Sequence, residues 1–402
     1  MSVLTPYRDE HLKMAESLVE ETHRNGGLAP VDVERFWADQ EAASRDPFGA
    51  DIPQVPLGAI LTGECVYDEL GVEVDFWRYD RDQAWRIELN KAYNDEAEKI
   101  VGRRILSEEW GDPSLVYPPT KQLYDLFEAR NEWHDQSWWL MQSARTEDEL
   151  IALLDRVEAR LEPEAFRAFI LPENWDEERE RLMARGIKPP IYRHQRGPIT
   201  FATSVYGPEN LIFLIGDNPD LATRFSNLIL QGMLALARLT RAEAGCTPET
   251  APHGFGFADD NCCLLSPAMY ELFGYPVLKG IFEAFCPNPE DVRHQHSDSA
   301  MGHLLPILGR LDMTGLNLGP TVMVKEIRKH APNAVIHGAL APFTYSRNEE
   351  INIVLEFLRD FEMTRERRGL VFATAGSINN GTKLTSMRLA MAAIQRYGRY
   401  DG

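Results

Sequence analysis

The fold of this chain is indicated by one stretch, Val292-Arg293-His294-Gln295-His296-Ser297-Asp298. It has the pattern of a short strand that ends in groups able to bind a metal ion or to move a proton. His294 and His296 are two residues apart, so on a strand their side chains share one face. With Asp298 beyond them they could bind zinc or a similar ion, and a hydrogen-bonded histidine pair without metal is the alternative.

Two other apolar runs also finish in His or Asp, GFGFADD at residues 254–260 and AVIHG at residues 334–338. Helix-length segments separate these runs, and from residue 197 at least five strand–helix units follow one another without a linker. Such alternation is typical of parallel strands with right-handed crossovers. We therefore predict an α/β fold, a single (β/α)8 TIM barrel with N-terminal helical additions.

The pattern predicts an N-terminal arm over residues 1–54 and the barrel over residues 55–402, with a helical insertion at about 118–190. Trp133, Trp138 and Trp139 of this insertion are interpreted as core or subunit-interface packing rather than a ligand platform. We expect strands at 56–61, 197–203, 254–259, 291–296, 315–318, 334–338 and 369–374. We expect helices near 7–24, 82–105, 219–243, 267–285, 300–312, 320–331, 348–364 and 382–397.

The composition narrows the class of protein. The 402 residues carry a formal net charge of −20, which argues against nucleic acid or an anionic membrane as a partner. Five cysteines without metal-ligand spacing fit a reduced cytoplasm better than a disulfide framework. The sequence shows no signal peptide and no run long enough to cross a bilayer, so a cytoplasmic protein is expected. Phosphate-binding loop, dinucleotide-binding and serine-hydrolase motifs are absent from the sequence.

In a barrel, the last residues of each strand and the loop after it line one opening. The candidates for that rim are Glu64, Asp259, Asp260, His296, Asp298, Asn317, His337 and Thr374. For each residue a structural role is the alternative. An aspartate at a strand end often caps a helix, and a lone histidine is often a hydrogen-bonded structural group. The convergence of several such residues is what favours a site.

From about residue 197 to the C-terminus the chain resembles the uroporphyrinogen decarboxylase superfamily, a group of TIM barrels that includes the haem-pathway decarboxylase and corrinoid-linked methyltransferases. The similar segments, in order, are GPIT (197–200), FADD (257–260) followed by LLSPAMY (264–270), HSD (296–298) followed by LLPIL (304–308), IHGALAP (336–342), GLVF (369–372) and RYGRY (396–400). These segments are spread over roughly half of the chain.

The chain differs from the superfamily at the residues that bind the substrate or the metal. The haem-pathway decarboxylase carries an arginine-rich segment for its substrate's carboxylates, where this chain has LGAILTGEC (57–65) with Glu64. The methyltransferases bind zinc through an H-x-C motif and a late cysteine. Here His296-Ser297-Asp298 replaces the first, and Gly376 replaces the second.

The resemblance implies an enzyme that acts on a small molecule, with methyl transfer to or from a corrinoid protein or thiol as the first hypothesis. Decarboxylation of uroporphyrinogen or a smaller acid is the second, and a non-catalytic ligand-binding barrel is the third. We assign catalysis to Asp260, His296 and His337, and substrate binding to Glu64, Asp259 and Asn317. Zinc is the expected metal, held by His296, Asp298 and His294, with cobalamin as methyl carrier. A homodimer is expected from the family.

Overall fold

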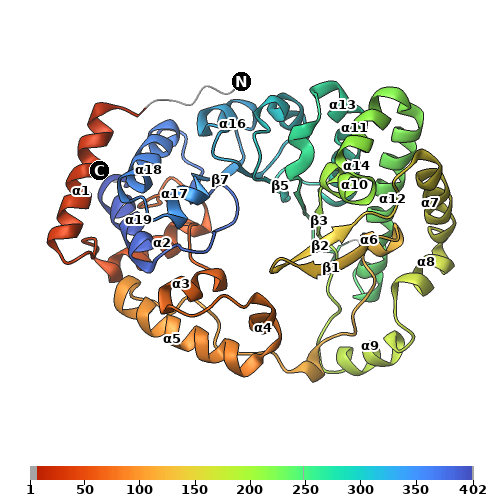
Figure 1. The fold of residues 1–402 in the computed structure, drawn as a ribbon, viewed down its shortest axis with the longest axis horizontal. Helices are drawn as coiled ribbons and strands as arrows, with labels where there is room; N and C mark the ends of the chain where they lie inside the picture. The colour runs from red at the N-terminus through yellow and green to blue at the C-terminus, as the bar shows by residue number, and fades with distance from the viewer. Residues whose placement is uncertain (1–6, 248, 401–402) are drawn as a thin grey trace. The chain divides into compact units, whose positions relative to one another are not determined.

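The structure, a computed structural model, describes residues 7–247 and 249–400 (Figure 1). Strands and helices alternate along its C-terminal half, and the strands are parallel, which confirms the predicted α/β class. The chain divides into two compact units. The first comprises the described residues of Met1–Trp110, Ser297–Leu305 and Gly315–Gly402, and the second comprises those of Gly111–His296 and Pro306–Thr314.

The strands of the second unit form a parallel sheet in the order β3 (His194–Arg196), β4 (Phe255–Ala258) and β5 (Arg293–Ser297), which ends at the unit boundary. Phe255 and Phe257 are buried on one face, where their rings meet Phe285 and Phe282 of helix α14. Because side chains alternate along a strand, Gly256 and Ala258 lie on the opposite face of the sheet. Their register partners on β5, His294 and His296, lie on that same face, so the prediction that the two histidines share a face is confirmed.

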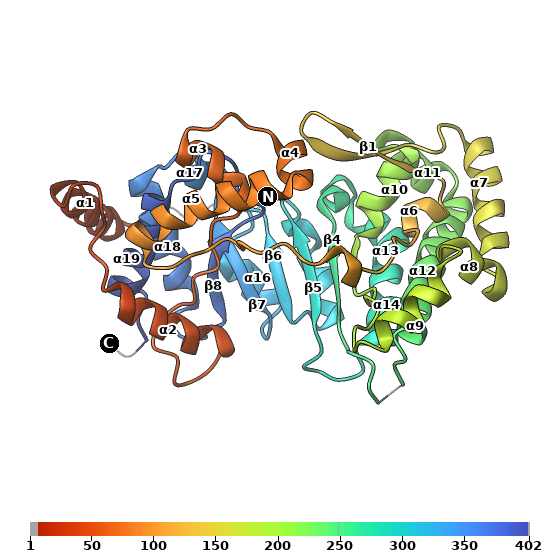
Figure 2. The same ribbon diagram turned by 90° about the horizontal axis from the view of Figure 1, so that it is seen from below.

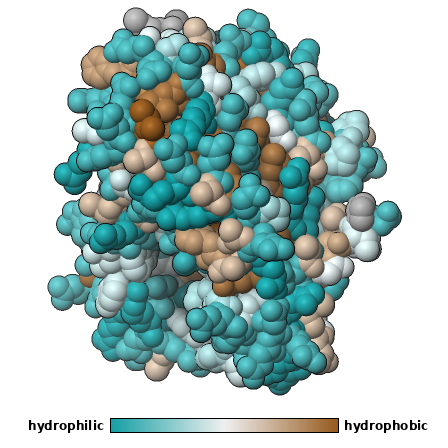
Figure 3. All heavy atoms as spheres, turned by 90° about the vertical axis from the view of Figure 1, so that its right-hand side faces the viewer, coloured by the Kyte–Doolittle hydropathy of each residue, from teal (hydrophilic) through white to brown (hydrophobic). Residues whose placement is uncertain are grey.

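The helices of the second unit are η2 (Pro113–Leu115), α6 (Leu123–Leu126), α7 (Glu147–Arg160), α8 (Pro163–Ile170), α9 (Trp175–Met183), α10 (Pro198–Tyr206), α11 (Pro208–Asp217), α12 (Pro219–Glu243), η3 (Asp260–Leu264), α13 (Pro267–Phe273), α14 (Tyr275–Phe285) and η5 (Gly309–Leu311). The prediction for α12 is confirmed at both ends. Figure 3 shows a mostly hydrophilic face with small hydrophobic areas. Such a face fits helices like α7, which buries Leu150, Leu153 and Leu154 and carries acidic residues in its first turn.

Two predictions for the second unit are wrong. Residues 197–203 form the start of helix α10 rather than a strand, because Pro198 suits the first helical turn and an external carboxylate caps the helix. The insertion is also not helical throughout, since β1 (Arg130–His134) and β2 (Ser137–Met141) form an antiparallel hairpin. Asp135 and Gln136 both have positive φ in its two-residue turn.

The hairpin changes the interpretation of the three tryptophans. Trp133 faces Trp138 across the strands, with the ring centroids 5.4 Å apart, and Trp139 stacks on His134 at 5.3 Å. Trp138 and Trp139 are 42% and 50% exposed. They therefore do not form core packing, and the alternative of a subunit interface stays a prediction.

The first unit contains three parallel strands, β6 (Gly315–Leu318), β7 (Val335–Leu340) and β8 (Leu370–Thr374), which lie side by side in that order (Figure 2). The segment predicted as a strand at 56–61 lies along β8. The amides of Gly58 and Ala59 both donate to the carbonyl of Phe372, whose own amide donates to the carbonyl of Pro56. This segment forms an isolated parallel bridge rather than a full strand, and it continues the sheet beyond β8.

The helices of the first unit are α1 (Asp9–Arg24), α2 (Val33–Arg45), η1 (Gly63–Cys65), α3 (Val66–Leu70), α4 (Phe76–Arg81), α5 (Gln83–Val101), η4 (Gly302–Leu304), α16 (Val324–His330), α17 (Pro342–Ser346), α18 (Glu350–Thr364) and α19 (Leu384–Tyr397). Helix α15 (Leu305–Leu308) crosses the unit boundary. The predicted helix at 300–312 is thus a series of short turns. No helix among the described residues has the length and apolar character needed to cross a membrane.

Candidate functional site

Asp260 and His296 lie together at the carboxyl ends of β4 and β5. The register pairs Ala258 with His296, and the amide of Asp259 donates to the carbonyl of His296 at 2.9 Å. This pairing brings Nε2 of His296 to 4.0 Å from Oδ1 of Asp260, with the two side chains 25% and 43% exposed. The distance is too long for a hydrogen bond but leaves both groups able to contact one ligand.

Asp298 follows His296 by two residues along the chain. Asp260, His296 and Asp298 each offer one ligand atom, and these atoms lie within 4.8 Å of one another. Two carboxylates and one imidazole suit a divalent cation that prefers oxygen and nitrogen ligands, and they differ from a thiolate zinc site. The group contains Asp260 where the sequence suggested His294, which lies two register positions before His296, beside Gly256.

Asp259, the predicted substrate-binding residue next to Asp260, is fully buried. Its Oδ1 accepts a hydrogen bond of 2.7 Å from the amide of Thr200 in the first turn of α10. The residue before that helix is Gly197, and any side chain there would overlap the Asp259 carboxyl group. Asp259 thus provides the cap that Gly197 itself lacks. Burial raises the pKa of Asp259 to about 6.

The same helix also holds the residues that follow Asp259. The amide of Asn261 donates to Oγ1 of Thr200 at 3.0 Å, and Nδ2 of Asn261 donates to Oγ1 of Thr203 at 2.7 Å. Asp260 therefore lies between two residues that are fixed to α10, which restricts where its carboxylate can point. These hydrogen bonds join the GPIT and FADD segments in the structure.

Sequence reasoning missed His194 and Arg196, because the residues after them were taken for the strand. His194 is in register with Gly256, and Arg196 is in register with Ala258, so both share the face of His294 and His296. Both side chains are exposed. Although the residue is exposed, partial desolvation of its ring and the neighbouring imidazole of His296 lower the pKa of His194. The alternation of His194 and Arg196 before GPIT was the signal available in the sequence.

Three predicted rim residues are joined within the first unit. Asn317 of β6 donates through Nδ2 to the carbonyl of His337 at 2.5 Å and to the carbonyl of Thr374 at 2.9 Å. Asn317 therefore links the three adjacent strands β6, β7 and β8, which is a structural role beside the predicted one. His337 lies within β7 and not at its end, because the strand continues to Leu340. Burial lowers the pKa of His337, so its imidazole favours the neutral form.

Glu64 of the first unit was also predicted for the rim, and Gly376 was identified as the residue that replaces the late cysteine of the methyltransferases. Glu64 is exposed in η1, and desolvation raises its pKa. Gly376 has φ +118° and lies against Asp298, whose carboxylate would overlap any side chain at position 376. The two positions where the methyltransferases carry cysteines are thus neighbours here. Whether the rim residues of the two units share one opening stays a prediction.

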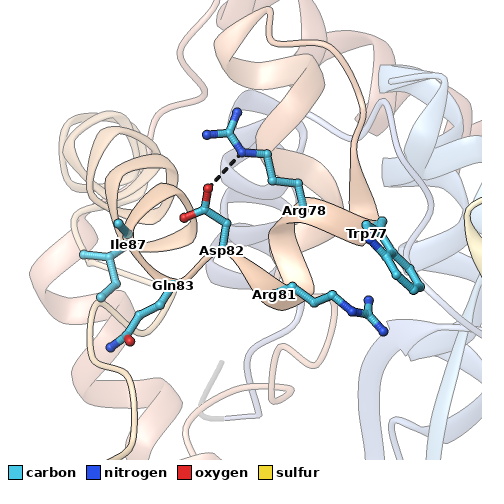
Figure 4. Close-up of a pocket in the computed structure, with 7 residues that line it drawn as sticks. Trp77, Arg78, Arg81, Asp82, Gln83 and Ile87 are labelled. Carbon is cyan, nitrogen blue, oxygen red and sulfur yellow. Dashed lines mark hydrogen bonds and ion pairs between the residues drawn. The ribbon is translucent and has the colours of Figure 1, made fainter.

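A hollow of about 760 Å³ lies at α4 and the start of α5 (Figure 4). Its arginines are already engaged, since Arg78 pairs with Asp82 at 3.0 Å and the Arg81 guanidinium lies 3.2 Å from the ring centre of Trp77. Asp82 also caps α5 by accepting from the amide of Trp85. The charged groups of the hollow thus serve the local structure, and we do not assign the chemistry to this hollow.

Comparison with known families identifies the chain. The family described as uroporphyrinogen decarboxylase (URO-D) matches residues 181–397, more than half of the sequence. The chain belongs to the URO-D family. The match covers Asp260, His296 and Asp298, as well as His194 and Arg196.

Comparison with other proteins adds little about this member of the URO-D family. A solved structure of a methyltransferase from Methanosarcina mazei is 17% identical, with a TM-score of 0.49, and the alignment covers 88% of this chain and 96% of that one. No curated protein matches the sequence. Family membership supports a small-molecule enzyme and does not distinguish among the reactions found in the family.

Proposed function

We propose that this URO-D family member catalyses methyl transfer between a small molecule and a corrinoid or thiol acceptor. The observation that supports this reaction is the group formed by Asp260, His296 and Asp298 at the strand ends. It corresponds in position to the strand-end motif with which the corrinoid-linked methyltransferases bind zinc. The same function includes cobalamin, free or on a partner protein, as the methyl carrier.

The three residues fit a divalent cation, because carboxylate and imidazole groups are ligands that zinc accepts. A divalent ion held there would polarise an oxygen or sulfur atom of the bound substrate. Asp260 is the more exposed member of its pair with His296, so its carboxylate would hold or move a proton at the substrate atom that loses the methyl group. His337, whose pKa is lowered by burial, would act as a neutral hydrogen-bonding group.

Metal content and methyl transfer test the proposal separately. Elemental analysis of the protein as purified is expected to find a divalent ion at up to one per chain, and Co²⁺ binding followed by absorbance should weaken at least 10-fold in His296→Ala and Asp260→Ala. His23→Ala is the control, since His23 pairs with Glu350 on the surface of the first unit. Cobalamin absorbance changes with methylated donors would establish the reaction. A blank result in both assays would refute it.

Decarboxylation of uroporphyrinogen or a smaller acid is the second candidate, favoured by the family match and by the accessible carboxylate of Asp260. A carboxylate in that position would stabilise positive charge that develops on a protonated pyrrole. Turnover of uroporphyrinogen that is lost in Asp260→Asn would establish this reaction. If neither reaction is detected and cells tolerate His296→Ala, a non-catalytic binding protein becomes the better explanation.

We also propose that the parallel strands of both units close into the eight-stranded barrel predicted from the sequence, and that the protein is a homodimer. The segment beside β8 supports the first point, since the first strand of a barrel pairs with the last. An experimental structure tests the closure. Sedimentation equilibrium tests the dimer, which a single species at the mass of one chain would refute.

A further inference from the structure

The face of β3 and β5 that carries His296 is rich in nitrogen groups able to donate hydrogen bonds, and one of them is a guanidinium. His194 and Arg196 on β3 share this face with His294 and His296 on β5. We refer to these four residues as the basic face. Three of the chain's 10 histidines lie on this face together with one arginine.

Strand β4 separates the two pairs with small residues only. Gly256 stands between His194 and His294 in the register, and Ala258 stands between Arg196 and His296. Nδ1 of His194 lies 3.0 Å from the place where a Cβ of Gly256 would be, so the missing side chain lets the imidazole lie over β4. No bulky group of β4 blocks the space between the two pairs.

His194 and Arg196 are exposed, and neither forms an ion pair with a carboxylate in the part of the chain that the structure describes. Arg196 donates through Nη1 to the hydroxyl of Ser204 at 3.2 Å, a neutral partner that orients the guanidinium without neutralising it. The carboxylate of Asp259 is turned away toward α10, and Asp260 lies near His296. The β3 side of the face thus keeps an uncompensated cation.

From this arrangement we infer that the basic face binds an anionic oxygen group of the small-molecule substrate, a carboxylate or a phosphate-type oxyanion. A guanidinium offers two parallel N–H donors that match such a group, and imidazoles add further donors. Since Arg196 and His296 lie at the carboxyl ends of their strands, the substrate's anionic end would be held beside the reacting group. The inference rests on the proposed function for the statement that the bound molecule is the substrate.

Binding of simple probes to the wild-type protein tests the inference. Propionate and propylphosphonate distinguish a carboxylate site from a phosphate-type site, and propionamide is the uncharged control of the same shape. Calorimetry is carried out on the protein as purified and again after EDTA dialysis. Either anion is expected to bind at least 10-fold more tightly than propionamide in both preparations, because a charge-assisted hydrogen bond is lost with the amide.

Variants assign the binding to the basic face. Arg196→Gln is expected to weaken binding of the preferred anion by about 10-fold to 100-fold, and His194→Gln by a smaller factor. Arg310→Gln makes the same charge change in the second unit, where Arg310 pairs with Glu271, and should leave binding within about 2-fold of wild type. Circular dichroism confirms that each variant is folded.

The inference is overturned if neither anion binds better than propionamide, or if Arg196→Gln binds the anion as tightly as wild type. These outcomes are separate from those of the proposed function. If anion binding depends on Arg196 but no methyl transfer is detected, the proposed reaction is refuted and the anion site is supported. Methyl transfer in a protein whose anion binding is unaffected by Arg196→Gln would support the reaction and refute the site.

Discussion

Replacing Asp259 with asparagine is expected to make the protein more stable at neutral pH and to change how its stability depends on pH. Burial raises the pKa of Asp259 from its ordinary value of 3.8 to about 6 in the folded protein. The folded state therefore keeps this proton up to about pH 6, whereas the unfolded chain releases it near pH 4. The folded protein consequently loses stability as the pH rises through this window.

The size of the effect follows from the two pKa values. A rise from 3.8 to about 6 corresponds to about 3 kcal/mol, at about 1.4 kcal/mol for each pH unit. The asparagine side chain would carry no such titration and would keep an oxygen to accept the hydrogen bond from the Thr200 amide. Oδ2 of Asp259 has no hydrogen-bond partner among the described residues, so the two amide hydrogens of asparagine would be unsatisfied where the neutral acid has one, and the measured gain should fall below this figure.

Urea denaturation of wild type and Asp259→Asn between about pH 4 and about pH 8 measures this difference. The free energy of unfolding of the variant, relative to that of the wild type, should increase as the pH rises. This difference should level off above about pH 6 to 7. Asp176→Asn is a control of opposite sign, because hydrogen bonding to Arg167 lowers the pKa of Asp176. The stabilising effect of the Asp176 carboxylate should be present above about pH 4 and lost below. A difference for Asp259→Asn that is constant over the whole range would refute the reasoning.

Three further substitutions test buried contacts of the fold by urea denaturation. Gly197→Ala is expected to cost about 1–3 kcal/mol, because its Cβ would displace the carboxyl group of Asp259, and full stability would contradict the cap. Glu243→Ala should cost about 3 kcal/mol, since the buried carboxylate accepts from Arg167 at 2.8 Å. Asn317→Ala should cost about 1–2 kcal/mol through the two carbonyl groups it leaves without their donor, and a cost near zero would show that water replaces it.

The sequence predicts the regular part of this fold well, because buried strands and amphipathic helices leave periodic patterns. Strand β6 and helix α12 have the predicted ends. Predictions fail where a distant residue decides the local structure. Residues 197–203 are rich in β-branched and aromatic side chains, yet Asp259, about 60 positions away, caps them as a helix. No local pattern contains that information.

The hairpin at Trp133 and Trp138 is a second case. Its turn uses Asp135 and Gln136 with positive φ, where Asn-Gly or Asp-Gly is the usual signal. The surrounding segment is charged and has helices on both sides, so the helical interpretation was the simpler one. The strands are held by cross-strand aromatic pairs instead, which a search for helical periodicity does not detect.

For the candidate site, the sequence identifies Asp260, His296 and Asp298 as strand-end groups, and the structure brings their ligand atoms together. Two features required three-dimensional information. Asp259 and Asp260 are adjacent and chemically identical in the sequence, but one is buried against α10 and the other is accessible. His194 and Arg196 became candidates only when the register placed them on the face of His296.

The two departures from the methyltransferase pattern, Asp298 and Gly376, are linked by their packing. Gly376 has a positive φ, which a glycine adopts without strain, and its missing side chain leaves the space that the Asp298 carboxylate fills. A cysteine at position 376 would collide with that carboxylate unless the Asp298 side chain moved. The proposed metal site would therefore consist of two carboxylates and one imidazole, a ligand set that suits a harder, oxygen-preferring ion better than a thiolate-rich set would.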